Sequence, residues 1–443
     1  MLDLCIVNAR VVNEGRIQTL DVGIKGGRIA TLATKIDQPA RETLDAAGRY
    51  LLPGMIDDQV HFREPGLTAK GDMATESAAA VAGGITSFMD MPNVNPPTLN
   101  SEALEAKFAL AHGRAYANYA FYHGASNDNL EAIKSLDPRA TCGIKIFMGS
   151  STGNMLVDDP HILEQMFDHA PIPIITHCED TPMIQEHERR AREQYGENVP
   201  FRLHGEIRSR EACLKSSTMA VELAKRFETR LHVLHLTTAD EMSLFTPGPV
   251  EGKLITSEAC VHHLWFCDED YDRLGADIKC NPAIKTAADR QALRDAINDG
   301  RIDVIATDHA PHTREEKNNT YFKAPSGLPL VQHALLSLLD QVKSGYFSLE
   351  TIVEKTSHNV AKRFEVAERG FIREGYFADL VLVDLEKTTT VTPSSLLYKC
   401  GWSPFEGTNF RAQISATFVN GIKVWDGSRI NAQAPGSRLT YNR

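Results

Sequence analysis

Short apolar segments alternate with longer segments of helical periodicity through the middle of the chain, and this alternation limits the fold more than any other feature. The eight apolar segments read MIDDQVHF, GITSFMDM, YANYAFYHG, CGIKIFMG, PIPIITHCE, LHVLHLTT, KLITSEA and DVIATDH. Repeated strand–helix alternation of this kind is typical of a (β/α)8 TIM barrel in the α/β class. A doubly wound open sheet is the competing fold, but no GxGxxG turn opens a helix here.

The two ends of the chain have a different pattern, with short alternating strands separated by turns. Neither residues 1–52 nor residues 366–443 carry enough apolar periodicity for a domain of their own. We therefore expect both ends to combine into one small β-sandwich, which leaves residues 53–365 as the barrel.

Composition narrows the class of partner. The net charge of −11 argues against binding to nucleic acid or to acidic membranes. No stretch approaches the roughly 20 apolar residues of a membrane span, and the N-terminus lacks the pattern of a signal peptide. The eight cysteines form no CxxC pair, which favours reduced thiols and a cytoplasmic protein. We expect a small-molecule substrate.

Polar side chains gather where the predicted strands end, which is where a (β/α)8 barrel carries its chemistry. They are Gln59 and His61, Asn93, Lys145, His177, His235 and Asp308. Burying such groups is costly unless they are paired or bind a metal. One histidine in an apolar strand is usually a hydrogen-bonded core residue, but that reading does not account for the whole set. Imidazoles with a carboxylate suit zinc or a similar divalent ion.

Strand alternation predicts which side chains face the barrel interior. On the first strand, Asp57, Gln59 and His61 share a face with Arg63, so we expect them to point inward and Asp58 to point toward the helices or sideways.

On the sixth strand, His232 and His235 have opposite parity, so we expect only His235 to face inward and His232 to be a structural residue under a helix. His309 has opposite parity to Asp308, and we expect it to play a supporting role at most.

The fourth strand carries Lys145 in an apolar setting. A protonated lysine beside a dication is repulsive, so Lys145 is either neutral or converted to an anionic carbamate that can bridge two metals. The alternative is a lysine that extends to solvent. The GSSTGN segment that follows, residues 149–154, lacks the GK[ST] of a phosphate-binding loop, and we interpret it as the loop after this strand.

Several motifs together resemble those of the dihydroorotases in the amidohydrolase superfamily. They are PGMIDDQVHFREPG, DMPNVNPPT, IKIFMGSSTGNM, THCED, HLTTAD, KCNPAIK and ATDHAPH, and GFIREGYFADLVLVD extends the likeness into the C-terminal part. The resemblance implies a (β/α)8 barrel with a flanking β-sandwich. It also implies the reversible conversion of dihydroorotate to N-carbamoyl-L-aspartate in pyrimidine synthesis.

The resemblance also implies roles for individual residues. His61 and Asp308 would hold one zinc ion and His177 and His235 a second, with carboxylated Lys145 between them. Asp308 would also act as the catalytic acid and base. The substrate would be bound by Arg63, Asn93, Asn281, His312, and the backbone at Ser326 and Gly327. A homo-oligomer or a complex with aspartate transcarbamoylase would fit the same family.

The chain departs from the family pattern at two positions. Gln59 stands where the family usually has its first metal-binding histidine, and Ala69 stands where many members have a histidine. An amide oxygen is a poorer zinc ligand than imidazole, so the sequence leaves open one or two metals per chain. Two other functions also stay open: a hydantoinase- or allantoinase-like cyclic amidohydrolase, and a catalytically inactive dihydroorotase-like subunit. The arginine in FREPG, Arg63, favours dihydroorotase because it can bind a carboxylate.

Overall fold

The computed structural model describes residues 1–149 and 155–443, and the expected (β/α)8 barrel is confirmed. Its parallel strands follow one another in chain order around the ring. They are β6 (Met55–Val60), β7 (Ile85–Asp90), β8 (Asn118–Phe121) with its continuation β9 (His123–Gly124), β10 (Ile144–Phe147), β11 (Ile174–His177), β12 (Leu231–Val233), β13 (Ile255–Cys260) and β14 (Val304–Ala306). The ring closes where Val60 bridges His309, just after β14.

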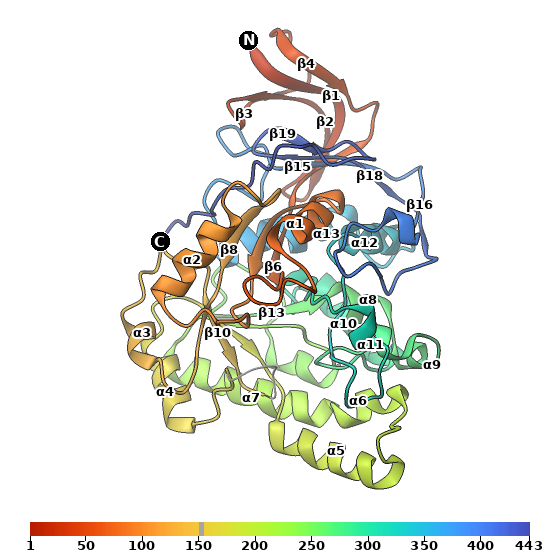
Figure 1. Cartoon of the computed structure of the whole chain (residues 1–443). Coiled ribbons are helices and arrows are strands. Elements are labelled where there is room, and N and C mark those ends of the chain that lie inside the picture. Colours follow the sequence, from red (N-terminus) through yellow and green to blue (C-terminus); the bar gives the residue numbers. More distant parts are fainter. Residues whose placement is uncertain (150–154) are drawn as a thin grey trace.

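Helices surround this ring of strands (Figure 1). The longer ones are α1 (Met73–Ala82), α2 (Ser101–Ala111), α4 (Pro160–His169), α5 (Thr181–Tyr195), α7 (Arg210–Phe227), α10 (Ala287–Asp299) and α12 (Ala334–Lys343). Many begin at a polar residue whose side chain accepts first-turn amides, as Asp72 does for α1 and Thr286 for α10. Their apolar faces pack on the outside of the strands, where Phe88, Val221 and Leu339 are fully or almost fully buried. Within the described residues, no helix is long and apolar enough to cross a membrane.

Both ends of the chain contribute to a single β-domain, as expected, and Figure 1 shows it beyond one end of the barrel. Its strands are β1 (Leu2–Asn13), β2 (Arg16–Lys25), β3 (Arg28–Ala33), β4 (Ala40–Asp45), β5 (Tyr50–Pro53), β15 (Leu380–Asp384), β18 (Gln413–Val419) and β19 (Ile422–Trp425). The two halves join where β15 runs antiparallel to β5 on one side and to β18 on the other. The domain has its own apolar core, which includes Ile6, Leu51 and Phe418.

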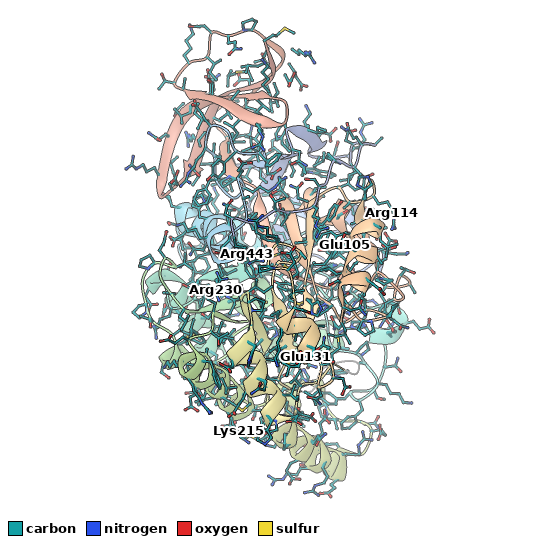
Figure 2. The ribbon with its side chains drawn as sticks, turned by 90° about the vertical axis from the view of Figure 1, so that its left-hand side faces the viewer. Glu105, Arg114, Glu131, Lys215, Arg230 and Arg443 are labelled. Atoms are coloured by element: carbon teal, nitrogen blue, oxygen red, sulfur yellow. The ribbon has the colours of Figure 1, made fainter. Side chains whose placement is uncertain are left out.

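The last residues leave this domain and lie against the barrel. Leu439 donates its backbone N–H to Tyr119 in β8, so the tail covers part of the edge of that strand. Leu439 and Tyr441 pack in the core that includes Phe364. At the end of the chain, Arg443 donates to the carbonyl of Pro138 at 2.7 Å. Figure 2 shows Arg443 and Arg230, which both form ion pairs with Glu365.

The first barrel strand carries a bulge that changes its alternation. Asp57 lies opposite Phe88 and Val60 opposite Asp90, so three steps along β6 match two along β7. The bulge brings Asp58 into the barrel interior, where its carboxylate lies 3.4 Å from His232 Nε2. The expectation that Asp58 points toward the helices or sideways is therefore wrong.

The sixth strand departs from the expected parity in a different way. His232 lies inside the barrel, with its Nε2 3.3 Å from Glu258 on the next strand. His235 follows the end of β12 and has a positive φ of 37°, which turns its side chain back into the mouth of the barrel. Both histidines thus face the barrel axis at different depths, and the expectation that only one does so is wrong. His309 bonds Glu76 at 2.9 Å and takes no part in lining the cavity, in keeping with a supporting role.

Candidate active site

One cavity at the carboxyl ends of the barrel strands brings together every candidate residue identified from the sequence. Its lining comprises Gln59, His61, Arg63, Asn93, Lys145, Phe147, His177, His235, Asn281, Asp308, Ala310, His312, Ser326 and Gly327. The cavity is small, with a volume of about 70 Å³. The lining residues lie far apart in the chain, from Gln59 to Gly327, because the ring of strands places the strand ends around one mouth.

Two of the histidines are oriented by hydrogen bonds to neighbouring side chains. His61 donates from Nδ1 to Asn93 Oδ1 at 2.8 Å, and His177 donates from Nε2 to Glu179 Oε2 at 2.9 Å. Arg208 in turn holds Glu179 at 3.0 Å. Metal-binding histidines usually have such a partner on the second ring nitrogen.

With these hydrogen bonds in place, each remaining ring nitrogen carries a lone pair and lies next to another polar atom of the site. His61 Nε2 lies 3.1 Å from Asp308 Oδ1, and His177 Nδ1 lies 3.0 Å from His235 Nε2. Burial lowers the pKa of His61 and His177, and lowers that of His235 well below its usual value. Neutral imidazoles beside a carboxylate are the donors that zinc requires, so this set fits a pair of divalent metals.

Lys145 lies among these donors and is only 1% exposed. Burial lowers its pKa to about 8, so a substantial fraction of the amine is neutral near physiological pH. Its Nζ lies 4.7 Å from the centroid of the Phe147 ring, and it forms no ion pair with the described residues. A neutral, buried amine is the form that can add carbon dioxide. Most of the GSSTGN loop interpreted from the sequence, residues 150–154, falls outside the described part of the chain.

Gln59 lies in the cavity wall next to the candidate acid and base. Its Nε2 donates to Asp308 Oδ1 at 3.1 Å, and its Oε1 lies 3.6 Å from the thiol of Cys260. The amide therefore fixes one oxygen of Asp308. Asp308 itself has a positive φ of 52°, a conformation unfavourable for residues other than glycine, and such strain clusters at functional sites.

The opposite wall of the cavity is cationic. Arg63 is buried and donates from Nε to the carbonyl of Pro311 at 3.0 Å, while its Nη2 lies 3.1 Å from His312 Nε2. Lys70 Nζ lies 3.1 Å from the other nitrogen of His312. Burial lowers the pKa of Arg63 to about 10, so it stays charged at neutral pH. Among the described residues no carboxylate forms an ion pair with Arg63, and Asp308 and Asp90 attract its charge only from a greater distance, so a buried cation faces the cavity.

The segment at Ser326 and Gly327 forms the third side of the cavity. Gly327 has a φ of 144°, and a Cβ there would lie 2.4 Å from the carbonyl oxygen of Ala310. Its N–H donates to Lys279, and its carbonyl accepts from Lys317 at 3.0 Å. These bonds fix the segment. Asn281 lies nearby with its Oδ1 buried and without a partner among the described residues.

Sequence reasoning did not identify Glu179, Arg208 or Lys70, which act on the cavity through other residues. Glu179 follows His177 by two positions in THCED, so strand alternation could have placed it on the same side. Lys70 and Arg208 come from loops and helix ends, where no periodic pattern points to the cavity.

Comparisons with known proteins agree with this architecture. The sequence profile of the Amidohydrolase family matches residues 50–424. A dihydroorotase from Halobacterium salinarum is 33% identical, with 96% of this chain and 98% of that protein covered. An allantoinase from Rubrobacter xylanophilus is 32% identical, with coverages of 98% and 96%. Among solved structures, the L-hydantoinase (dihydropyrimidinase) from Arthrobacter aurescens has a TM-score of 0.92 at 27% identity, covering 99% of this chain and 100% of that one.

Proposed function

The chain belongs to the amidohydrolase family, and from this premise we propose that it is a dihydroorotase, a cyclic amidohydrolase that interconverts (S)-dihydroorotate and N-carbamoyl-L-aspartate. The dihydroorotases among its relatives support this reaction, and the allantoinases at similar identity make allantoin the main competing substrate.

The observation that carries the substrate proposal is the buried charge of Arg63. A buried guanidinium without a carboxylate partner is costly, so the cavity favours a ligand that supplies a negative charge. Dihydroorotate carries a ring carboxylate, whereas hydantoin and allantoin are neutral rings. Because Nε and part of Nη2 are already bonded, the free edge of Arg63 is the Nη1 side, which can meet a carboxylate in bidentate fashion.

The donor set supports a proposal of two zinc ions. We propose that His61 and Asp308 hold one, that His177 and His235 hold the other, and that Lys145 carries a carboxyl group between them. Bound zinc would lower the pKa of a water molecule and polarise the amide carbonyl of the ring.

The remaining steps belong to the side chains of the cavity. Asp308 accepts the proton of the attacking water and passes it to the ring nitrogen that leaves, acting first as base and then as acid. Gln59 keeps one carboxylate oxygen of Asp308 in place through its 3.1 Å hydrogen bond. Arg63 and His312 hold the substrate carboxylate, so that the ring amide is presented to Asp308. In the direction of ring closure the same groups act in reverse order.

A substrate panel tests this proposal. We expect the purified protein, supplied with zinc, to convert dihydroorotate and N-carbamoyl-L-aspartate into each other and to leave hydantoin and allantoin unchanged. Faster turnover of allantoin or hydantoin than of dihydroorotate would overturn the substrate assignment. A protein that binds zinc but turns over none of these would support an inactive subunit.

A substitution at Arg63 tests which residue selects the substrate. Arg63→Lys keeps the charge but loses the planar fork, so we expect KM for dihydroorotate to rise. The loss of binding free energy should be that of one hydrogen bond to a charged group, about 1.5–3 kcal/mol. Zinc content, measured on the same samples, should stay constant. Arg41→Lys, at an exposed arginine, is the control and should leave both values unchanged.

A further inference from the structure

A second group of possible metal ligands lies behind Gln59, outside the lining of the cavity. Cys260 ends β13, and His262 and His263 follow in the first turn of α8 (Val261–Trp265). All three side chains are buried, with at most 3% of their surface exposed. The thiol sulfur and one nitrogen of each ring lie within 4.8 Å of one another.

Three of the four ring nitrogens in the two imidazoles of this group lack a hydrogen-bond partner among the described residues. Within the described part of the chain neither ring nitrogen of His262 has a partner in good hydrogen-bond geometry, and the nearest backbone group is that of Thr307. His263 donates from Nε2 to the carbonyl of Pro282 at 3.1 Å, which leaves the lone pair of Nδ1 without a partner. Buried polar atoms are nearly always satisfied in native proteins, so such orphans point to a missing ion or water. A backbone carbonyl on the second nitrogen is also the usual arrangement of a metal-binding histidine.

The chemistry of the three groups matches a borderline-soft cation. Burial lowers the pKa of His263 to about 4 and that of His262 well below its usual value, so both rings are neutral donors. Two oxygen atoms lie beside the thiol sulfur, Gln59 Oε1 at 3.6 Å and Glu258 Oε1 at 3.5 Å. Nitrogen, sulfur and oxygen ligands in a group of four are a frequent set for zinc.

We propose that Cys260, His262 and His263 bind a zinc ion behind the cavity wall, with an oxygen of Gln59 or Glu258 as the fourth ligand. This site is separate from the donor set of His61, Lys145, His177, His235 and Asp308, which contains no thiol. The proposal does not depend on which substrate the protein uses. It gives Gln59 a role that a histidine at this position would not share, because its amide oxygen faces the thiol while its Nε2 holds Asp308.

A sulfur ligand supplies a signal that the cavity donors cannot produce. We expect X-ray absorption of the zinc protein as purified to show a sulfur shell at about 2.3 Å in addition to nitrogen and oxygen. Protein produced with Co²⁺ in place of zinc should show a thiolate-to-cobalt charge-transfer band in the near ultraviolet. Nitrogen and oxygen scatterers alone, together with a cobalt spectrum that lacks this band, would overturn the proposal.

A pair of cysteine substitutions assigns the signal. Cys260→Ser should abolish the charge-transfer band and lower the metal content by one ion per chain. Cys213→Ser is the matched control, because Cys213 is also buried but its thiol lies 3.9 Å from Thr237 on another part of the barrel. The control should keep both the band and the metal. An unchanged band in Cys260→Ser would overturn the site, whereas turnover of dihydroorotate by the cobalt protein reports separately on the proposed function.

Discussion

At the scale of single residues, Gln59 is a position where this chain departs from the pattern expected of a dihydroorotase. Its amide does not face the cavity as a free ligand, because Nε2 bonds Asp308 and Oε1 faces Cys260. An ion bound at His61 and Asp308, as we propose, would thus have one imidazole fewer than the family pattern supplies. An ion bound at His177 and His235 would keep both of its imidazoles.

This difference predicts unequal retention of the two cavity metals. Gln59→His should increase the metal that survives dialysis, because imidazole is the better zinc ligand. Gln59→Ala should lose less metal and activity than His235→Ala, which removes a principal ligand. Metal per chain and turnover after identical dialysis are the measurements. If Gln59→Ala lost both as completely as His235→Ala, Gln59 would be a principal ligand.

The lowered pKa of Lys145 predicts that its carboxylation depends on pH. Carbon dioxide adds only to the neutral amine, and the pKa of Lys145 is lowered to about 8, so its neutral fraction grows as the pH rises through this value. Metal-free protein in ¹³C-bicarbonate should therefore show a stronger carbamate NMR signal well above pH 8 than well below it. Lys145→Gln is the control and should lack the signal. A signal that persists in this variant would place the modification on another lysine.

At the scale of elements, the segment that carries Ser326 and Gly327 shapes the cavity through its backbone. Gly327→Ala would place a methyl group 2.4 Å from a carbonyl oxygen and force a φ of 144° on alanine. We expect a loss of roughly 1–3 kcal/mol in the free energy of unfolding and a higher KM. Gly345→Ala is the matched control, because Gly345 also has a positive φ but an open surrounding. Equal effects of both substitutions on KM would exclude a role of this segment in binding.

Most barrel elements could be predicted from the sequence, because buried parallel strands appear as apolar runs and their ends carry the polar residues. The depth and direction of individual side chains could not. The bulge in β6 turns Asp58 inward, and the left-handed backbone of His235 lets it join His232 on the barrel axis. Both features depend on local backbone geometry, which does not change the pattern of apolar residues in the sequence. Cys260 and His263 were not identified from the sequence, because Cys260 ends a strand and His263 lies in the helix that follows it.

At the scale of the whole molecule, the C-terminal part of the chain pairs with earlier strands at two places. The β-domain joins β5 to β15, and the C-terminal tail then returns to β8 near the amino ends of the barrel strands. This second pairing covers backbone groups of β8 that would otherwise be an exposed edge. The sequence could not predict it, because the tail has no periodicity and its partners lie some 300 residues away.

The tail should therefore stabilise the barrel without taking part in its chemistry. Leu439 is 1% exposed in the interior core, and Leu439→Ala should lower the free energy of unfolding by about 2–5 kcal/mol. Turnover well below the unfolding transition should stay constant, because Leu439 bonds Tyr119 at the opposite end of the strands from the cavity. Met219→Ala, at an exposed apolar residue, is the control and should change stability by no more than about 0.5 kcal/mol. Urea denaturation and turnover of the same samples separate the two effects. Reduced turnover at unchanged stability would mean that the tail acts on the active site and not only on the fold.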